Sequence, residues 1–263
     1  MKEITAKFET LINVMFTLRS EDGCPWDRAQ SLQDLRQYLL EEAYEVLQAM
    51  DHQDYPQLME ELGDLLFQIV FQAQMMQENR TFTLFEVVDR LISKMVGRHP
   101  HVFGELKAGS PEQALDNWES MKDREKASMS GANRSILEGI PLQLPALLQA
   151  LMISSKVVRV GFEWETEADV WKKVEEEIQE FHNASTNDQK MEEMGDLLFT
   201  IVNVARKNKI NPEDALRAAN LKFRDRFMKL EKKAYESDRK IQDLSLQEMD
   251  EIWEQVKVSP KKD

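Results

Sequence analysis

Apolar residues recur at intervals of three and four along most of the chain, which is the spacing of one face of an α-helix. The pattern predicts an amphipathic helix near the N-terminus, followed by a loop over residues 20–27 that contains Gly23 and Pro25. The apolar face of this first helix consists of Ile4, Phe8, Leu11, Ile12, Met15 and Leu18.

A second helix is predicted over residues 32–50, with Ser31 as its N-cap and Asp34 three residues further on. At about 100° per residue, Glu42 and Glu45 border the apolar face of this helix instead of lying opposite to it. The residues expected to be buried are Leu32, Leu35, Leu39, Ala43, Val46 and Met50.

The helical pattern continues through the rest of the first half. After a turn at residues 54–56, a helix carries Glu61 and Asp64 and continues to about residue 78. The next predicted segments are a helix over residues 84–96, a loop over 104–116 and a short helix over 118–126.

The helical period stops over residues 127–145, where Gly, Pro, Ser and Asn gather, and this segment is predicted to be a linker. The expected domains are therefore residues 1–126 and residues 146–263. In the second domain the pattern predicts a helix whose apolar face is Val170, Val174, Ile178 and Phe181. A turn at residues 183–187 and a second helix follow. After a break at Asn211 and Pro212, a long helix is predicted over residues 213–235. Since no clear strand occurs, we expect an all-α protein of two tandem helical bundles.

One nine-residue stretch occurs twice, as MEELGDLLF from Met59 and as MEEMGDLLF from Met191. Eight of the nine positions are identical, which indicates an internal duplication. The first copy opens an apolar stripe that we expect to be buried, made of Leu62, Leu65, Leu66, Ile69 and Ala73, and the second copy repeats it with Leu197, Leu198, Ile201 and Val202.

Alignment of the halves shows which polar residues recur. The acids Glu41, Glu42, Glu45, Glu61 and Asp64 match Glu176, Glu177, Glu180, Glu193 and Asp196. The cations Lys94 and Arg98 match Lys222 and Arg226, and a W-E-x-x-K run recurs as Trp118 to Lys122 and as Trp253 to Lys257. Trp164 in the second half likewise corresponds to Trp26 in the first.

The repeated acids indicate a metal site. Two adjacent helices that each carry carboxylates three residues apart can direct four acids to one point, where they repel one another unless a cation is present. Ligand sets made only of oxygen suit a hard divalent ion, above all Mg²⁺ with Mn²⁺ as a substitute. The alternative is a solvated acidic face on a helical regulatory or assembly module.

The repeated cations indicate a polyanion. Lys94 and Arg98 lie one helical turn apart, as do Lys222 and Arg226, and like charges at this spacing repel slightly. Binding of phosphate oxygens would compensate this repulsion, because a guanidinium can bind such oxygens through two hydrogen bonds. The alternative is that these cations only form ion pairs with nearby surface acids.

Composition narrows the class of protein. The net charge of −14 and a pI near 4.9 argue against general affinity for nucleic acid polymers or anionic membranes. Cys24 is the only cysteine, so no intrachain disulfide and no thiolate zinc cluster can form. The N-terminal segment reads as a helix and not as a signal peptide, and we expect a cytoplasmic protein.

Taken together, these motifs resemble the MazG nucleoside triphosphate pyrophosphohydrolases of the all-α NTP pyrophosphatase superfamily. The E-E-x-x-E motif of that family stands here from Glu41 and from Glu176, and its E-x-x-D motif stands from Glu61 and from Glu193. The resemblance implies hydrolysis of NTP substrates to NMP and pyrophosphate, and homodimers with sites at helix interfaces. It also implies that Glu177, Glu180, Glu193 and Asp196 bind Mg²⁺, and that Lys222, Arg226 and Trp253 contact the nucleotide, with Lys173, Glu176 and Glu177 nearby.

We therefore expect a Mg²⁺-dependent pyrophosphohydrolase that cleans the nucleotide pool with broad specificity, in which Glu176 or Glu41 positions or deprotonates the attacking water. By the repeat, Lys257 and the first-half residues Lys94, Arg98, Trp118 and Lys122 are further candidates for nucleotide contacts. A relative selective for dUTP or dCTP is the nearest alternative. Because the basic pair of the second half lies on a longer uninterrupted helix, we expect the second half to be the main catalytic site.

Overall fold

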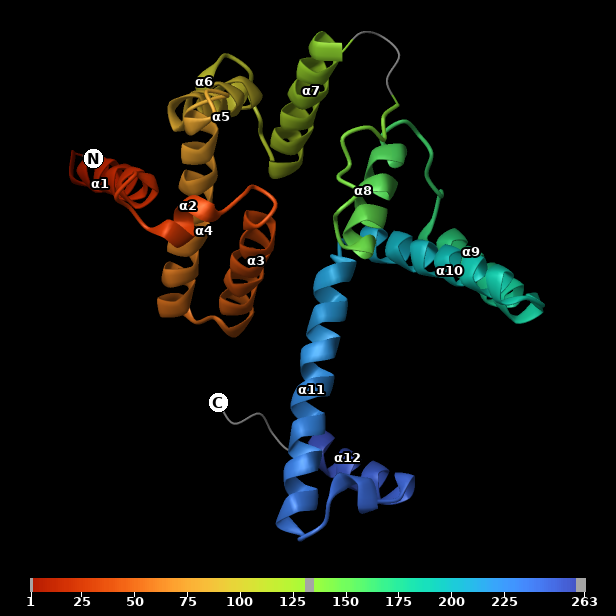
Figure 1. The fold of residues 1–263 in the computed structure, drawn as a ribbon. Coiled ribbons are helices and arrows are strands. Elements are labelled where there is room, and N and C mark those ends of the chain that lie inside the picture. The colour runs from red at the N-terminus through yellow and green to blue at the C-terminus, as the bar shows by residue number, and fades with distance from the viewer. Residues whose placement is uncertain (1, 131–134, 259–263) are drawn as a thin grey trace. The chain divides into compact units, whose positions relative to one another are not determined.

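The computed structural model describes the backbone of residues 2–130 and 135–258, and the chain divides into two compact units, Met1–Gly131 and Ala132–Asp263 (Figure 1). Every regular element of the described residues is a helix, so the predicted all-α fold with two tandem helical units is confirmed. No helix among these residues combines the length and the apolar composition needed to cross a membrane.

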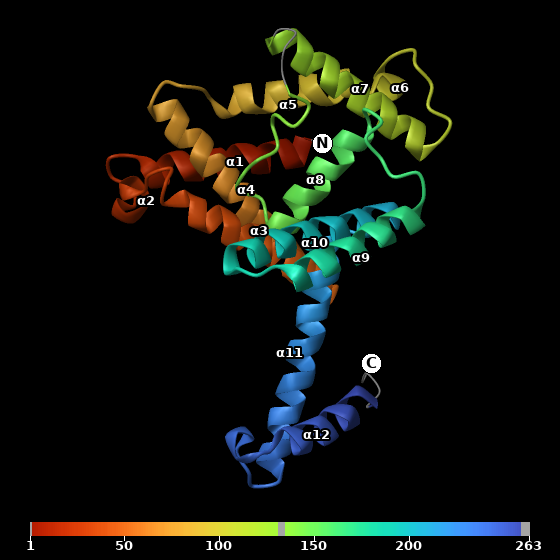
Figure 2. The ribbon, with the colours of Figure 1, turned by 90° about the vertical axis from the view of Figure 1, so that its right-hand side faces the viewer.

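The first unit is organised around a hairpin of two long helices, α3 and α4, which make its most extensive contact (Figure 2). Helices α1 and α5 pack against α4, and α7 packs along α5. The helices of this unit are α1 (Lys2–Arg19), α2 (Pro25–Ala29), α3 (Leu35–His52), α4 (Tyr55–Glu78), α5 (Leu84–Arg98), α6 (Pro100–Phe103) and α7 (Pro111–Ser130).

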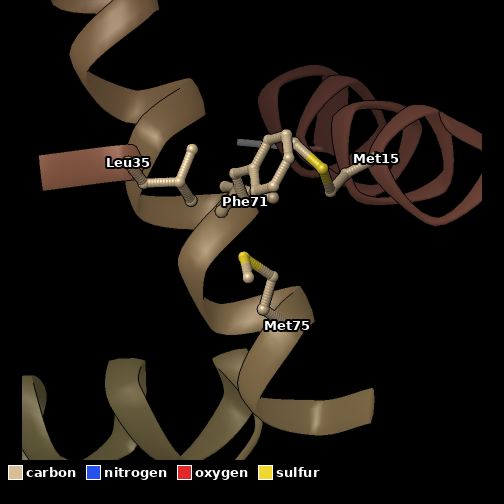
Figure 3. Packing of buried hydrophobic residues seen from close by; sticks show 5 residues of the cluster. Met15, Leu35, Phe71 and Met75 are labelled. Carbon is tan, nitrogen blue, oxygen red and sulfur yellow. The ribbon is translucent and has the colours of Figure 1, made fainter. Parts of the chain in front are cut away.

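A small apolar core joins α1, α3 and α4. The ring of Phe71 on α4 lies between Met15 of α1 and Leu35 of α3, with Met75 one turn further along α4 (Figure 3). Each of these side chains is at least nine-tenths buried. Full burial of one such side chain contributes about 1.5–3 kcal/mol, so this cluster fixes the start of the hairpin against the N-terminal helix.

The second unit repeats the hairpin as α9 and α10, with α8 packed against α10. The first part of its long helix α11 contacts α8 and α10, and α12 packs against α11 (Figure 1). The elements of this unit are α8 (Ala146–Val158), α9 (Glu167–Asn183), α10 (Asn187–Lys207), α11 (Pro212–Glu236), the 3₁₀ helix η1 (Ile241–Asp243) and α12 (Leu246–Val258). The core of the hairpin is Val170, Val174 and Val204, with Trp164 and Leu197 against it.

Side-chain caps explain where several helices begin. At α5, Thr83 accepts a hydrogen bond from the backbone of Glu86, and the Glu86 carboxylate accepts from the backbone of Thr83. The same reciprocal capping box starts α9 at Thr166 and α10 at Thr186. Such a cap satisfies backbone N–H groups that no helical partner reaches, and it is typically worth about 1 kcal/mol.

The predicted boundaries differ from the structure in the connecting segments. The loop expected over residues 20–27 already contains the start of α2, and α3 begins at Leu35, although Ser31 and Asp34 make the expected reciprocal hydrogen bonds one turn earlier. The loop expected over 104–116 gives way to α7 at Pro111, and α7 continues to Ser130 within the segment expected to be a linker. Residues 131–134 of that segment lie outside the described residues.

The apolar stripes predicted to be buried are only partly covered within their own unit. On α4, Ala73 is buried, but Leu62 is 50% exposed and Ile69 is 45% exposed. Met50 on α3 and Leu32 just before α3 are exposed as well. The matching residues of α10, Leu198 and Ile201, are exposed as well. The helical period identifies residues that share a face, whereas the neighbour that covers this face has to come from elsewhere.

In both units a cation ties the loop before the hairpin to the end of its second helix. Arg19 pairs with Glu78 of α4 at 2.7 Å and donates to the backbone oxygen of Asp27 at 2.6 Å. In the second unit, Arg206 pairs with Glu163 at 2.7 Å and Lys207 donates to the backbone oxygen of Trp164. These contacts hold the segment that leads into α3 or α9, the helices that carry the first set of acids.

Candidate active site

The first group of acids lies between the two helices of the first hairpin. Glu42 and Glu45 from α3 and Glu61 from α4 place carboxylate oxygens within 4.8 Å of one another. Glu61 is buried, Glu42 is half-buried and Glu45 is exposed, so the group opens from the hairpin towards solvent. Three carboxylates at this distance form a strongly negative point at the hairpin surface.

The second hairpin repeats this arrangement. Glu177 and Glu180 from α9 and Glu193 from α10 also place carboxylate oxygens within 4.8 Å of one another. Glu177 is only 4% exposed, and Glu193 is half-buried. The angular placement read from the sequence therefore brings three of the four expected acids together in each unit.

Asp64 and Asp196, the fourth acid of each expected set, are exposed and do not belong to these close groups. Each lies one helical turn beyond the glutamate contributed by α4 or α10. Asp64 nevertheless contributes to the field of its group, because its charge is among the causes that raise the pKa of Glu42.

Burial and mutual repulsion raise the pKa values of acids in the first group. Burial raises the pKa of Glu42, and the charges of Asp64, Glu45 and Glu61 add to this effect. At Glu45, which is exposed, the charge of Glu61 is the largest cause of its raised pKa. Each group of acids is thus held by the fold against its own electrostatic cost.

A lysine distinguishes the second group from the first. The ammonium of Lys173 lies 2.8 Å from a carboxylate oxygen of Glu176 and 2.8 Å from one of Glu177, and these bonds raise the lysine pKa. Burial raises the pKa of Glu180, but the charge of Lys173 opposes this shift. In the first unit the corresponding residue is Tyr38, whose ring packs edge-on against Trp26 and brings no charge.

The basic residues of the first unit lie on α5 and α7. Arg98 forms two hydrogen bonds to one carboxylate oxygen of Glu125, at 2.9 and 2.7 Å, and its guanidinium lies 5.4 Å from the ring centre of Trp118. The ammonium of Lys122 lies 4.9 Å from the same ring centre. Lys94 lines the same groove between α5 and α7 as Arg98. Trp118 thus orders cations from two helices.

In the second unit the corresponding residues lie on α11 and α12. The ring of Trp253 packs against Phe223 with ring centres 5.1 Å apart, and Lys257 pairs with Glu254. Lys222 and Arg226 make no hydrogen bond or ion pair with any residue that the structure describes. They are therefore available to an anion without breaking an existing ion pair.

The repeated acids and the repeated cations lie on different helices in both units. Among the described residues, no hydrogen bond or ion pair joins the repeated acids to Lys94, Arg98, Lys222 or Arg226. The cation that does reach an acid group is Lys173, which the resemblance placed near the nucleotide. Sequence reasoning missed two further cations of the α5–α7 groove, Arg90 and Arg124. Arg90 was detectable, because it lies one helical turn before Lys94 on the same face.

The acid groups fit a divalent metal ion. Their donors are carboxylate oxygens alone, they lie within 4.8 Å of one another, and one member of each group is buried. Hard divalent cations prefer oxygen ligands, and such a cation would offset both the burial that raises the pKa of Glu42 and the repulsion that raises the pKa of Glu45. Glu42, Glu45 and Glu61 would hold the ion in the first unit, and Glu177, Glu180 and Glu193 in the second.

Comparison with known proteins gives two matching family models, a MazG nucleotide pyrophosphohydrolase domain over residues 30–103 and phosphoribosyl-ATP pyrophosphohydrolase over residues 154–222. The chain is 41% identical over 257 residues to a nucleoside triphosphate pyrophosphohydrolase/pyrophosphatase MazG of Thermotoga maritima, covering 98% of both proteins. It is also 41% identical to a nucleoside triphosphate pyrophosphohydrolase of Escherichia coli K12, covering 95% of this chain and 97% of the relative. A protein of Bacillus subtilis, uncharacterized protein YabN, is 41% identical over 261 residues, which make up 52% of its length.

The repulsion within the acid groups predicts how stability responds to pH and to metal. Because the native state raises the pKa of Glu42, Glu45 and Glu180, it binds protons more readily than the unfolded chain, so these groups make the metal-free protein more stable as pH falls through the raised pKa values. We expect Mg²⁺ to raise the melting temperature at pH about 7.5 and to do so less at pH about 5.5, where protons compete for the acids.

Thermal unfolding of Glu45→Gln provides the direct comparison, with Glu9→Gln on α1 as the matched control. Glu45→Gln should melt higher than wild type without metal and gain less from Mg²⁺, whereas Glu9→Gln should behave as wild type. An equal response to Mg²⁺ in all three proteins would contradict the assignment of the acids to a metal site.

Proposed function

Because the chain belongs to the MazG family of nucleoside triphosphate pyrophosphohydrolases, we propose that the acid groups of its two helical hairpins are the place where it hydrolyses nucleoside triphosphates to nucleoside monophosphates and pyrophosphate. The observation that carries this proposal is the repetition of the same three-carboxylate geometry in both hairpins of a chain 41% identical to such enzymes over nearly its whole length. The broad range of substrates expected from the sequence is part of the same proposal.

The proposed cofactor is Mg²⁺, with Mn²⁺ as a substitute. Oxygen donors, their mutual distance and the raised pKa values support a divalent cation at each group. When bound, such an ion would supply a Lewis acid for the phosphate oxygens and lower the pKa of coordinated water. Asp64 and Asp196 would join the ligand set after a change of side-chain rotamer, since both are exposed and lie one turn away.

The remaining chemistry is assigned to side chains of this chain. Glu176 and Glu41 are exposed carboxylates next to the acid groups, and either can accept a proton from the attacking water or orient it. Lys173 holds Glu176 and Glu177, so it fixes the direction of both carboxylates before substrate arrives. Such fixed charges reduce the reorganisation that the reaction requires.

The phosphate chain is assigned to the repeated cations. Lys222 and Arg226 in the second unit, and Lys94 and Arg98 in the first, would neutralise the β- and γ-phosphates and the charge that develops on departing pyrophosphate. Trp118 orders two cations of the first unit, because its ring lies under Arg98 and Lys122. On the second unit, Trp253 and Lys257 lie on α12, which packs against the helix that carries Lys222.

We propose that the second unit is the main catalytic unit, on grounds that differ from those read in the sequence. A helix end does not leave Arg98 mobile, because Glu125 and Trp118 hold it. The relevant difference is that Arg98 is already paired, whereas Arg226 is not paired with any described residue. In addition, Lys173 adds an oriented cation to the second acid group.

We also propose a homodimer. The exposed apolar residues of α4 and α10, including Leu62, Ile69 and Leu198, leave a hydrophobic stripe on each hairpin. Gly63 and Gly195 lie inside these helices at matching places, and a Cβ at either glycine would meet nothing within 4 Å. A glycine inside a helix costs about 1 kcal/mol relative to alanine, so its repetition without a packing reason inside the unit fits close approach of another helix.

The products provide the test of the reaction. In ¹⁸O-labelled water we expect the label in NMP and none in pyrophosphate, because water attacks the α-phosphorus. Mass spectrometry of both products measures this directly. Label in free orthophosphate would instead mean cleavage at the γ-phosphate and would contradict the proposal.

Two double variants test the ranking of the units. Glu193→Gln with Asp196→Asn should abolish most of the turnover, while Glu61→Gln with Asp64→Asn should retain most of it; both should fold, since removal of like charges relieves repulsion. Steady-state pyrophosphate release measures the activity, and circular dichroism checks helicity. The reverse order would show that the first unit does the work, and an equal loss would show two independent sites.

Substitution at Gly63 tests the dimer. Gly63→Leu should shift the protein from dimer to monomer in analytical ultracentrifugation, because a large side chain keeps the helices apart. Gly63→Ala is the matched control, and it should keep the helix, since space for a methyl group exists within the unit. A monomeric wild type, or a Gly63→Leu variant as dimeric as wild type, would exclude this surface.

A further inference from the structure

A basic groove lies between α5 and α7 of the first unit and has a volume of about 510 Å³. It contains four positively charged side chains in a protein whose net charge is −14. Its lining residues are Arg90, Ser93, Lys94, Gly97 and Arg98 from α5, and Met121, Arg124 and Glu125 from α7. Glu125 is the one carboxylate among these described lining residues, and it is occupied by Arg98.

The cations of the groove face one another at a cost. Arg90, Lys94 and Arg98 are spaced four residues apart and so lie on one face of α5, about 6 Å apart along its axis. Like charges at this spacing destabilise a helix slightly, and Arg124 adds a fourth from the facing helix. An arrangement that costs stability in the free protein is explained if an anion neutralises it.

Three of the four cations are available to such an anion. Arg90, Lys94 and Arg124 make no hydrogen bond or ion pair with the residues that the structure describes. Arg98, in contrast, is fixed by Glu125 and by the ring of Trp118. The groove therefore combines one rigid guanidinium with three cations that can adjust to a ligand.

One residue on the α5 face of the groove is a glycine. Gly97 lies inside α5, between Ser93 and Arg98 on the groove face, and a Cβ there would meet nothing within 4 Å. The packing of α5 therefore does not require glycine at this place, although glycine weakens a helix by about 1 kcal/mol relative to alanine. A glycine on this face leaves room for a ligand between the cations.

Two of the four cations are absent from the second unit. The repeat pairs Lys94 with Lys222 and Arg98 with Arg226, but Arg90 corresponds to Ala218. When Trp118 is aligned with Trp253, Arg124 corresponds to Ser259, which lies outside the described residues. The first unit thus carries, beyond the basic pair common to both halves, two arginines on opposite walls of the groove.

We propose that this groove is a binding site for an oligophosphate chain of three or more phosphates, such as the tail of a nucleoside triphosphate, and that Arg90 and Arg124 set its preference for the longer chain. The inference rests on the assignment of Lys94 and Arg98 to phosphate in the proposed function. Each added phosphate brings further charge and acceptor oxygens, so a longer chain reaches cations on both walls, whereas orthophosphate reaches only some of them.

Isothermal titration of the full chain with orthophosphate, pyrophosphate and tripolyphosphate tests this preference. Chelator is present throughout, so that no divalent ion bridges the anion to the acids. Affinity should rise with chain length, and Arg90→Gln and Arg124→Gln should each weaken tripolyphosphate binding about tenfold, the loss of one charge-assisted contact. Arg80→Gln, an exposed arginine of the same unit outside the groove, is the matched control and should bind as wild type.

Arg124→Lys adds a second criterion, because it keeps the charge but loses the fork of the guanidinium, and it should recover part of the affinity. Binding that is independent of chain length, or unaffected by both Arg→Gln variants, would overturn the inference. If hydrolysis remained sensitive to Glu193→Gln with Asp196→Asn in that event, the proposed function would stand. Tight, Arg90-dependent binding of a single-stranded oligonucleotide in preference to tripolyphosphate would instead identify a nucleic-acid surface and overturn it as well.

Discussion

Repulsion among carboxylates is the constraint on which this protein is built. Each hairpin holds three glutamate side chains with oxygens within 4.8 Å of one another, and in each group one of them is buried. No ordinary packing argument favours this arrangement, because burial and like charge both act against the ionised form. The surrounding structure has to hold it, and it does so with the apolar core around Phe71, with capped helices, and with cations such as Arg19 and Arg206 that anchor the loops leading into the acid-bearing helices.

The two units of the duplication carry the same repelling acids but differ in the cations around them. The first unit has a tyrosine where the second has Lys173, and it has arginines at Arg90 and Arg124 that the second lacks. Beyond the basic pair that both units share, the second unit therefore adds a positive charge at its acids, whereas the first adds two in the α5–α7 groove. A pair of hairpins with the same backbone plan can in this way specialise through a few side chains, because the helices that carry them do not have to change.

The sequence predicted what depends on local periodicity and missed what depends on long-range packing. The angular positions of Glu42, Glu45 and Glu61 follow from the helical period, and the structure places their oxygens together. The start of α7 was missed because Gly and Pro suggested a loop, although Ser110 before Pro111 is an ordinary helix start and accepts a hydrogen bond from Gln113. The exposure of Leu62 could not be read from an apolar stripe, and Arg124 reaches the groove only because α7 folds back along α5.

Lys173 acts as a counter-ion that is covalently part of the chain. A dissolved ion leaves when its concentration falls, but a tethered ammonium remains at an effective concentration that dilution does not change. The second hairpin therefore carries part of its own charge balance, while the first depends on what the surrounding solution supplies. One polypeptide thus contains two copies of the same acid group whose stability depends differently on ionic composition. A fall in free divalent cation should destabilise the first hairpin before the second.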